Sequence, residues 1–139
     1  MTVVTKSIEI AESMFPSEYD RREGYQAFHF CFIWKRNKLI STGTNNPNRE
    51  NGRVVLFAQK FNVPDMIKWP YMHAEIDAIS KLWGRYHINS SLKTVVLRIN
   101  NRMQLKPSMP CNRCMPVLSG LGLDKRLWYS DNKKVVKHS

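Results

Sequence analysis

The sequence predicts an α/β fold in which helices cover a mixed sheet of four to five strands. Segments with apolar residues at helical spacing alternate with short segments rich in β-branched and aromatic residues, in the order α-β-β-α-β-α-β. This alternation requires at least one right-handed β-α-β crossover, so the last two strands of the series should be parallel neighbours. A chain of 139 residues has the usual length of one domain. We therefore expect residues 1–139 to form a single domain.

The amino-terminal half predicts a helix followed by a strand hairpin. Residues 6–15 place apolar side chains at helical intervals, and we expect the helix to end at Pro16, which follows them. Residues 26–34 and 39–42 are rich in aromatic and branched side chains, and a polar turn separates them. In the long connection that follows, residues 54–61 could form a short helix.

The carboxy-terminal half predicts two more helices, each followed by a strand. Residues 73–84 have helical spacing, and residues 93–99 form a compact apolar strand. Pro110 favours a helix that begins at once, so residues 111–121 should be helical up to a glycine-rich stop. Residues 126–129 predict a further strand.

The composition points to a water-soluble protein that attracts polyanions. The chain has 22 Lys and Arg residues against 11 Asp and Glu residues, a formal net charge of +11. No apolar run approaches the roughly 18 residues that span a bilayer, so we expect no membrane partner. The first residues lack the pattern of a secretory signal, and we expect a cytoplasmic location. A basic surface with no ligand is the alternative interpretation of the charge.

Two of the three cysteines and one histidine are candidates for metal chemistry. Cys31 lies in an apolar run, where a buried free thiol is the expected state. Cys111 and Cys114 have the Cys-x-x-Cys spacing, which alone fits a redox pair, half of a structural zinc site or two buried thiols. His73, which alone could be an ordinary core histidine, adds a third zinc ligand. No second Cys-x-x-Cys is present to complete a structural tetrahedron, which leaves the fourth position to water.

Glu75 favours a catalytic zinc over a structural one. Three protein ligands and a water form the usual catalytic arrangement, in which zinc lowers the pKa of the water from about 15.7 to about 7. Glu75 stands two residues after His73 and can reach that water as a general base without binding the metal. Both cysteines should lie in the first helical turn, where the helix dipole favours the thiolate. The residues thus predict Zn²⁺ held by His73, Cys111 and Cys114.

These motifs resemble the signature of zinc nucleobase deaminases, His-x-Glu followed by Pro-Cys-x-x-Cys. The matching segments are His73-Ala-Glu75 and Pro110-Cys-Asn-Arg-Cys114. The chain resembles the cytidine deaminase-like superfamily over most of its length, and is most similar to its small phage and bacterial members. The resemblance implies a three-layer α-β-α fold with helices on both faces of the sheet.

The resemblance also implies substrate contacts. Asn45 matches an asparagine that contacts the sugar or base in the superfamily, although Asn-Asn-Pro is also a good turn sequence. The carbonyl of Ser108 matches a backbone group that recognises the amine. Tyr129 matches a position at which polynucleotide deaminases read the base on the 5′ side of the target; the alternative is that Tyr129 only packs beside Trp128.

The implied reaction replaces the exocyclic amine of a nucleobase by oxygen, with Glu75 moving the protons. The basic surface favours cytosine in single-stranded nucleic acid, with DNA first, ahead of free cytidine or deoxycytidylate and of adenosine in RNA. A short antiparallel strand at Val135 and Val136 would resemble the free-cytidine enzymes and the bacterial toxin deaminases instead. A zinc-stabilised nucleic-acid-binding module without catalysis is the alternative from another functional class, against which Glu75 counts. The sequence does not indicate an oligomeric state.

Overall fold

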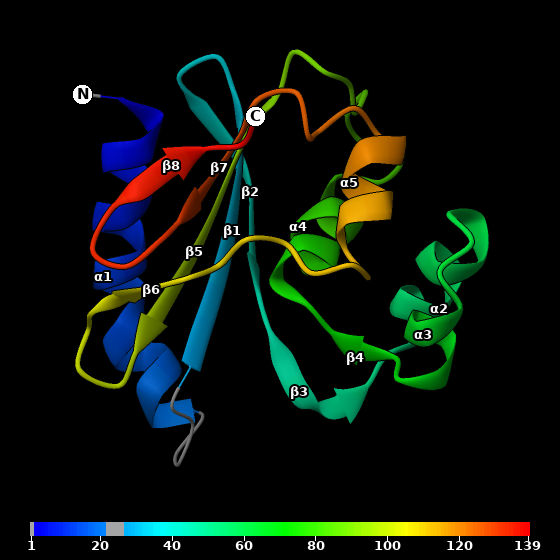
Figure 1. The fold of residues 1–139 in the computed structure, drawn as a ribbon, viewed down its shortest axis with the longest axis horizontal. Helices are drawn as coiled ribbons and strands as arrows, with labels where there is room; N and C mark the ends of the chain where they lie inside the picture. The colour runs from blue at the N-terminus through cyan, green and yellow to red at the C-terminus, as the bar shows by residue number, and fades with distance from the viewer. Residues whose placement is uncertain (1, 22–26) are drawn as a thin grey trace.

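A mixed sheet forms the centre of the computed structural model, which describes residues 2–21 and 27–139 (Figure 1). Within that part of the chain the sheet has six strands, five of them in the order β2-β1-β5-β7-β8. Their bounds are β1 Ala27–Lys35, β2 Lys38–Thr44, β5 Lys93–Asn100, β7 Leu127–Ser130 and β8 Val135–Lys137. The sixth strand, β6 (Leu105–Lys106), pairs with β5 and was not predicted. None of the described helices combines the length and apolarity needed to cross a bilayer.

The strand directions confirm the mixed sheet. β1 is antiparallel to both β2 and β5, whereas β5 and β7 are parallel, as the alternation of helices and strands predicts. β8 then returns antiparallel to β7, which confirms the short final strand. The first residue expected in β1, Gln26, lies outside the described residues.

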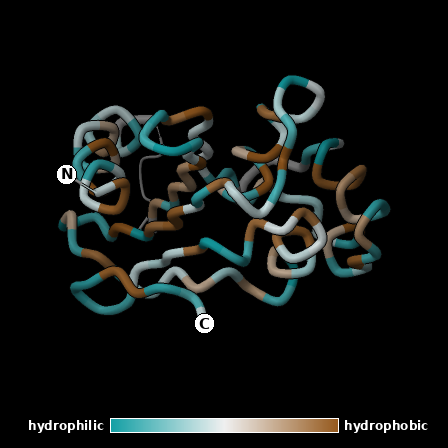
Figure 2. Tube along the Cα trace, turned by 90° about the horizontal axis from the view of Figure 1, so that it is seen from above, coloured by the Kyte–Doolittle hydropathy of each residue, from teal (hydrophilic) through white to brown (hydrophobic). Residues whose placement is uncertain are grey.

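Helices cover both faces of the sheet (Figure 1). The helix α1 (Val3–Arg21) lies on one face, and α4 (Ala74–Leu82) and α5 (Met115–Gly120) lie on the other. Side chains alternate along β1, so Phe30 and Phe32 join the core beneath α1, while Cys31 and Ile33 join the core beneath α4. Figure 2 shows the same arrangement, with hydrophobic segments inside and hydrophilic residues on the peripheral loops.

The first helix is longer than predicted, because α1 continues through Pro16 to Arg21. Proline lacks an N–H and removes the helical hydrogen bond to the carbonyl of Glu12. Both Pro16 and Glu12 are exposed, so water can hydrogen-bond that carbonyl. On the buried side, the ring of Phe15 lies 5.2 Å from that of Phe28 and 5.7 Å from that of Tyr19. This packing stabilises the helix beyond the proline.

The connection between β2 and α4 contains the predicted short helix and additional elements. α2 (Gly52–Lys60) begins after Asn51, whose side chain accepts a hydrogen bond of 2.9 Å from the backbone of Arg53. α3 (Pro64–Lys68) has a proline at its start. The strands β3 (Asn46–Glu50) and β4 (Tyr71–Met72) pair with each other and bring the chain back to the start of α4.

α4 lies directly on β2 because Gly43 has no side chain. A Cβ atom built on Gly43 would lie 2.1 Å from the carbonyl oxygen of Ala74 and 2.5 Å from the amide nitrogen of Ala78. Hydrogen bonds hold the same contact: Ser41 Oγ donates to the Ala78 carbonyl at 2.7 Å, and the Thr44 amide donates to Asp77 at 2.9 Å. The position of the first turns of α4 is therefore fixed relative to the sheet.

Gly43→Ala should destabilise the fold by about 1–3 kcal/mol, because the new methyl group requires α4 to move away from β2. Urea unfolding followed by circular dichroism measures the change. Gly52→Ala is the matched control, since a Cβ there meets nothing within 4 Å. The control should be neutral or stabilising by up to about 1 kcal/mol, because alanine is the better helix former. Equal stability of the two variants would contradict the proposed role of Gly43.

Candidate zinc centre

His73 and Glu75 lie at the start of α4. His73 is the N-cap residue, and its carbonyl accepts a hydrogen bond of 3.0 Å from the Asp77 amide. Glu75 lies in the first turn and is only 5% exposed. The extended backbone of His73 continues β4, whereas Glu75 already has helical backbone. The contact of α4 with Gly43 therefore determines where both side chains lie.

Cys111 and Cys114 lie in the turn that leads into α5. The prediction that both cysteines belong to the first helical turn is wrong, because α5 begins at Met115 and Cys114 is its N-cap. Pro116, rather than Pro110, occupies the early helical position that suits proline. The Met115 amide donates to the Cys111 carbonyl at 2.9 Å, which closes the turn and brings both cysteines to the same side.

The structure brings the three predicted metal ligands together. The ligand atoms of His73, Cys111 and Cys114 all lie within 4.8 Å of one another. One imidazole and two thiolates form a donor set that suits zinc. Cys31, by contrast, is buried in the core beneath α4, and burial raises the pKa of its thiol, so the prediction of a buried free cysteine is confirmed.

The protonation of the cluster fits a cation site. A hydrogen bond from the Cys114 thiol, with a further one from His73, lowers the pKa of Cys111 to about 3. The same hydrogen bond, together with burial, raises the pKa of Cys114. Hydrogen bonding to Cys111 also raises the pKa of His73. Cys111 therefore favours the thiolate form that a zinc ion requires.

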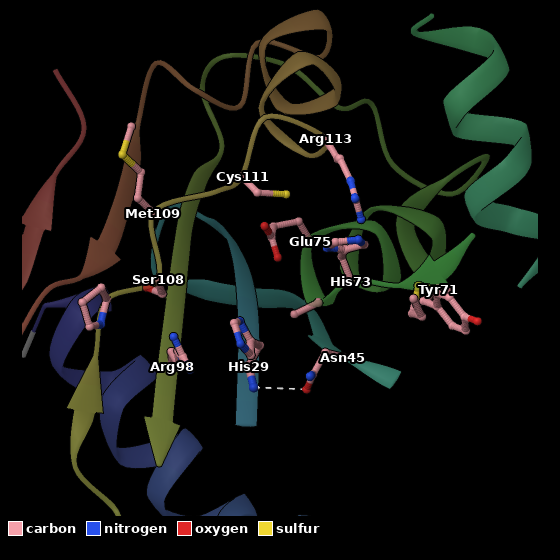
Figure 3. A pocket seen from close by; sticks show the side chains of 13 residues that line it. His29, Asn45, Tyr71, His73, Glu75, Arg98, Ser108, Met109, Cys111 and Arg113 are labelled. Carbon is pink, nitrogen blue, oxygen red and sulfur yellow. Dashed lines mark hydrogen bonds between the residues drawn. The ribbon is translucent and has the colours of Figure 1, made fainter. Parts of the chain in front are cut away.

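Glu75 lies against this cluster without belonging to it. Its side chain and that of Cys111 face the same space (Figure 3). Burial is the largest effect on the carboxyl group and raises its pKa. A raised pKa makes a carboxyl group a better proton acceptor than an ordinary carboxylate, which suits a general acid–base group.

A cavity of about 450 Å³ opens beside the cluster (Figure 3). Asn45 and Ser108, the predicted substrate contacts, both line it. Asn45 Oδ1 accepts a hydrogen bond of 3.1 Å from the His29 amide and thereby links β1 to the end of β2. Ser108 Oγ donates to the Val96 carbonyl at 2.7 Å and accepts from the Ser130 amide at 2.8 Å, so its hydroxyl joins β5 to β7. The predicted contact of the Ser108 carbonyl with the amine stays a prediction.

Tyr129 is not among the residues that line the cavity. It is half-buried and packs against the core beneath α4, with its ring 6.4 Å from that of His138. Trp128, the alternative packing partner, contributes to the core beneath α1 on the other face of the sheet. The role of Tyr129 in reading a neighbouring base stays a prediction.

Three basic residues that line the cavity were not predicted from the sequence: His29, Arg98 and Arg113. His29 and Arg98 interrupt otherwise apolar strands, which is the signal that could have identified them. Burial, followed by the nearby charges of Arg98 and His73, lowers the pKa of His29 to about 4. The imidazole is therefore neutral at pH 7 and contributes hydrogen-bonding capacity rather than charge.

One of three comparisons with known proteins matches the chain, and it agrees with the zinc site described above. No curated protein and no solved structure matches the chain. Residues 10–130 match the family model described as the cytidine and deoxycytidylate deaminase zinc-binding region. The matched region contains the sheet up to β7 together with Glu75 and the cluster of His73, Cys111 and Cys114. The chain therefore belongs to the cytidine and deoxycytidylate deaminase family, as a deaminase with a His-Cys-Cys zinc site.

Proposed function

We propose that this deaminase converts cytosine to uracil in single-stranded nucleic acid, with DNA as the favoured polymer. The observation that carries the proposal is the basic lining of the cavity beside the zinc cluster, where Arg98 and Arg113 lie. The chain as a whole has a net charge of +11. Each cationic side chain that neutralises a phosphate releases counterions and adds affinity for a polyanion.

Glu75 is the residue that we propose moves protons in this reaction. A zinc ion held by His73, Cys111 and Cys114 would supply a Lewis acid that lowers the pKa of water. The Glu75 carboxylate accepts a proton from the water that attacks C4 of the cytosine ring. It donates that proton to ring N3, then takes the proton of the hydroxyl group now on C4 and passes it to the departing amine, which leaves as ammonia while the C4–O double bond forms. The burial of Glu75 keeps bulk water away from these transfers.

The cavity residues orient the base and sugar in this proposal. Asn45 Oδ1 accepts a hydrogen bond from the backbone N–H of His29. The side-chain Nδ2 of Asn45 is therefore the group that donates to a sugar or base oxygen. The Ser108 carbonyl accepts a hydrogen bond from the exocyclic amine. The hydrogen bonds of the Ser108 hydroxyl to Val96 and Ser130 hold that segment against the sheet.

Free cytidine or deoxycytidylate is the second candidate substrate. The antiparallel strand β8 favours it, because this strand resembles the arrangement expected of free-cytidine enzymes. Ammonia release from deoxycytidine, deoxycytidylate and a single-stranded oligonucleotide with one cytosine tests both candidates. Conversion of the mononucleotide or nucleoside alone would contradict the polymer substrate.

The protein should contain one zinc ion per chain after metal-replete expression, because its three ligand atoms lie together. Cys111→Ser and His73→Ala should lose most of the metal, as measured by elemental analysis. Cys31→Ala is the matched cysteine control and should keep its zinc, since Cys31 lies in the core outside the cluster. Wild-type protein without zinc, or equal loss in the control, would contradict the assignment.

Glu75→Gln should retain zinc and fold but deaminate at least about 100-fold more slowly, because the amide cannot transfer the protons. Uracil formation under saturating substrate measures the effect. Asp77→Asn, in the same turn of α4, is the control: its side-chain oxygen can still accept from the Thr44 amide, and its rate should stay near that of the wild type. A Glu75→Gln variant with wild-type turnover would exclude the proposed role.

Affinity for single-stranded DNA should fall as salt is raised, with a log–log slope of about 0.7 per phosphate neutralised. Fluorescence anisotropy of a labelled oligonucleotide at several salt concentrations gives the slope. Turnover of deoxycytidine, which has no phosphate, is the control and should change much less. A flat salt dependence for the oligonucleotide would contradict binding of the strand by basic side chains.

A further inference from the structure

Three basic side chains form a row across three neighbouring strands. His29 on β1 is the direct partner of Arg98 on β5, and Arg98 is the direct partner of Lys106 on β6. Directly paired residues of antiparallel strands point to the same face of the sheet. Leu105 packs into the core beneath α1, so Lys106 points to the opposite face, which carries the cavity. Figure 3 shows Arg98 and His29 next to each other below Glu75 and Cys111.

Neither Arg98 nor Lys106 forms an ion pair with a carboxylate among the described residues. Arg98 Nε is buried and has no hydrogen-bond partner. Burying a guanidinium nitrogen without a hydrogen-bond acceptor costs free energy, so this atom lacks a partner that it needs. Lys106, directly opposite, carries the same charge, and facing like charges destabilise a strand pair. Glu75 is the one carboxylate among the residues that line the cavity, and it lies against the zinc ligands. An anion from solution would therefore stabilise the row.

We propose that Arg98 and Lys106 bind a phosphate group of the substrate and make the enzyme select phosphorylated cytosine compounds over free nucleosides. This inference rests on the proposed deamination of cytosine at the adjoining site. The guanidinium group presents its donors in a planar fork that matches phosphate oxygens, and a lysine adds a second charge. The phosphate is either the 5′-phosphate of a mononucleotide or a backbone phosphate of a strand, since both offer the same oxygens.

Arg98→Ala should lower kcat/KM for phosphorylated substrates about 10- to 100-fold, the effect of losing hydrogen bonds to a charged group. The substrates are deoxycytidine, deoxycytidylate and an oligonucleotide with one cytosine, and deoxycytidine should change less than about twofold. Lys106→Ala should show a smaller loss with the same selectivity, and Arg98→Lys should recover part of the activity. Zinc content and circular dichroism verify that each variant is folded and loaded.

Lys35→Ala is the matched control. Lys35 faces Lys38 across β1 and β2 as Arg98 faces Lys106, but it is exposed and lies at the opposite end of β1 from His29. The change in net charge is the same, so a general electrostatic effect would appear in both variants. The control should retain wild-type kcat/KM on all three substrates.

The substrates on which Arg98→Ala loses kcat/KM show which phosphate the site binds. A loss confined to deoxycytidylate identifies the phosphate of a free nucleotide, whereas a loss confined to the oligonucleotide identifies a strand phosphate. Equal losses on all three substrates, or none on any, would overturn the phosphate site. If Arg98→Ala does not fold, the same comparison for Lys106→Ala decides the question.

Calorimetry separates this inference from the proposed reaction. If the wild type converts none of the three substrates, the proposed function fails, but the phosphate site can still be measured on the zinc-loaded protein. At least about tenfold tighter binding of deoxycytidylate or of the oligonucleotide than of deoxycytidine, lost in Arg98→Ala, would support the site. Equal affinities of the wild type for all three compounds would contradict it.

Discussion

The contact between α4 and β2 at Gly43 is the constraint on which the site depends. Because Gly43 has no Cβ, the backbone of α4 rests on the strand at Ala74 and Ala78, and Asp77 fixes the same turn through the Thr44 amide. His73 and Glu75 lie within this turn, so a shift of the helix would move a metal ligand and the proton-transfer group together. The cysteines reach the same point from the turn that leads into α5, and α5 packs in the core beneath α4 through Val117 and Leu118. The starts of two helices on one face of the sheet thus bring together a histidine and two cysteines that are far apart in the chain.

Cys111 and Glu75 have different surroundings, which shift their pKa values in opposite directions. Cys111 is exposed at the cavity, and hydrogen bonding from Cys114 lowers the pKa of Cys111 to about 3; Glu75 is buried, and burial raises the pKa of Glu75. One group thus favours the anion that a metal requires, while the other favours the protonated form of a general acid. Arg98 lines the same cavity, and its buried Nε has no hydrogen-bond partner among the described residues. In the binding mode that we propose, the base lies at the zinc ligands and the phosphate lies at Arg98.

The elements of the fold and the metal ligands that were predicted correctly depend on patterns within short segments of the sequence. The periodicity around β1, β5 and α4 gave the layers, and the parallel pairing of β5 with β7 follows from the order of the elements. The metal ligands could be predicted because zinc chemistry restricts residue type and spacing. Two helix boundaries were wrong for different reasons: tertiary packing of Phe15 extends α1 beyond Pro16, and a local turn after Pro110 delays α5 until Met115. Arg98 interrupts an apolar strand in the sequence, but its place in a row with His29 and Lys106 depends on strand register, which a single sequence does not reveal.

Direct competition between substrates tests the central claim of cytosine deamination in single-stranded nucleic acid. Limiting zinc-loaded enzyme is incubated with equal concentrations of deoxycytidylate and a single-stranded oligonucleotide containing one cytosine, and mass spectrometry follows replacement of the amine by oxygen in each. The account predicts that the oligonucleotide is converted first, because the basic cavity and surface bind more than one of its phosphates. Conversion of deoxycytidylate ahead of the oligonucleotide, or of neither compound, would contradict it.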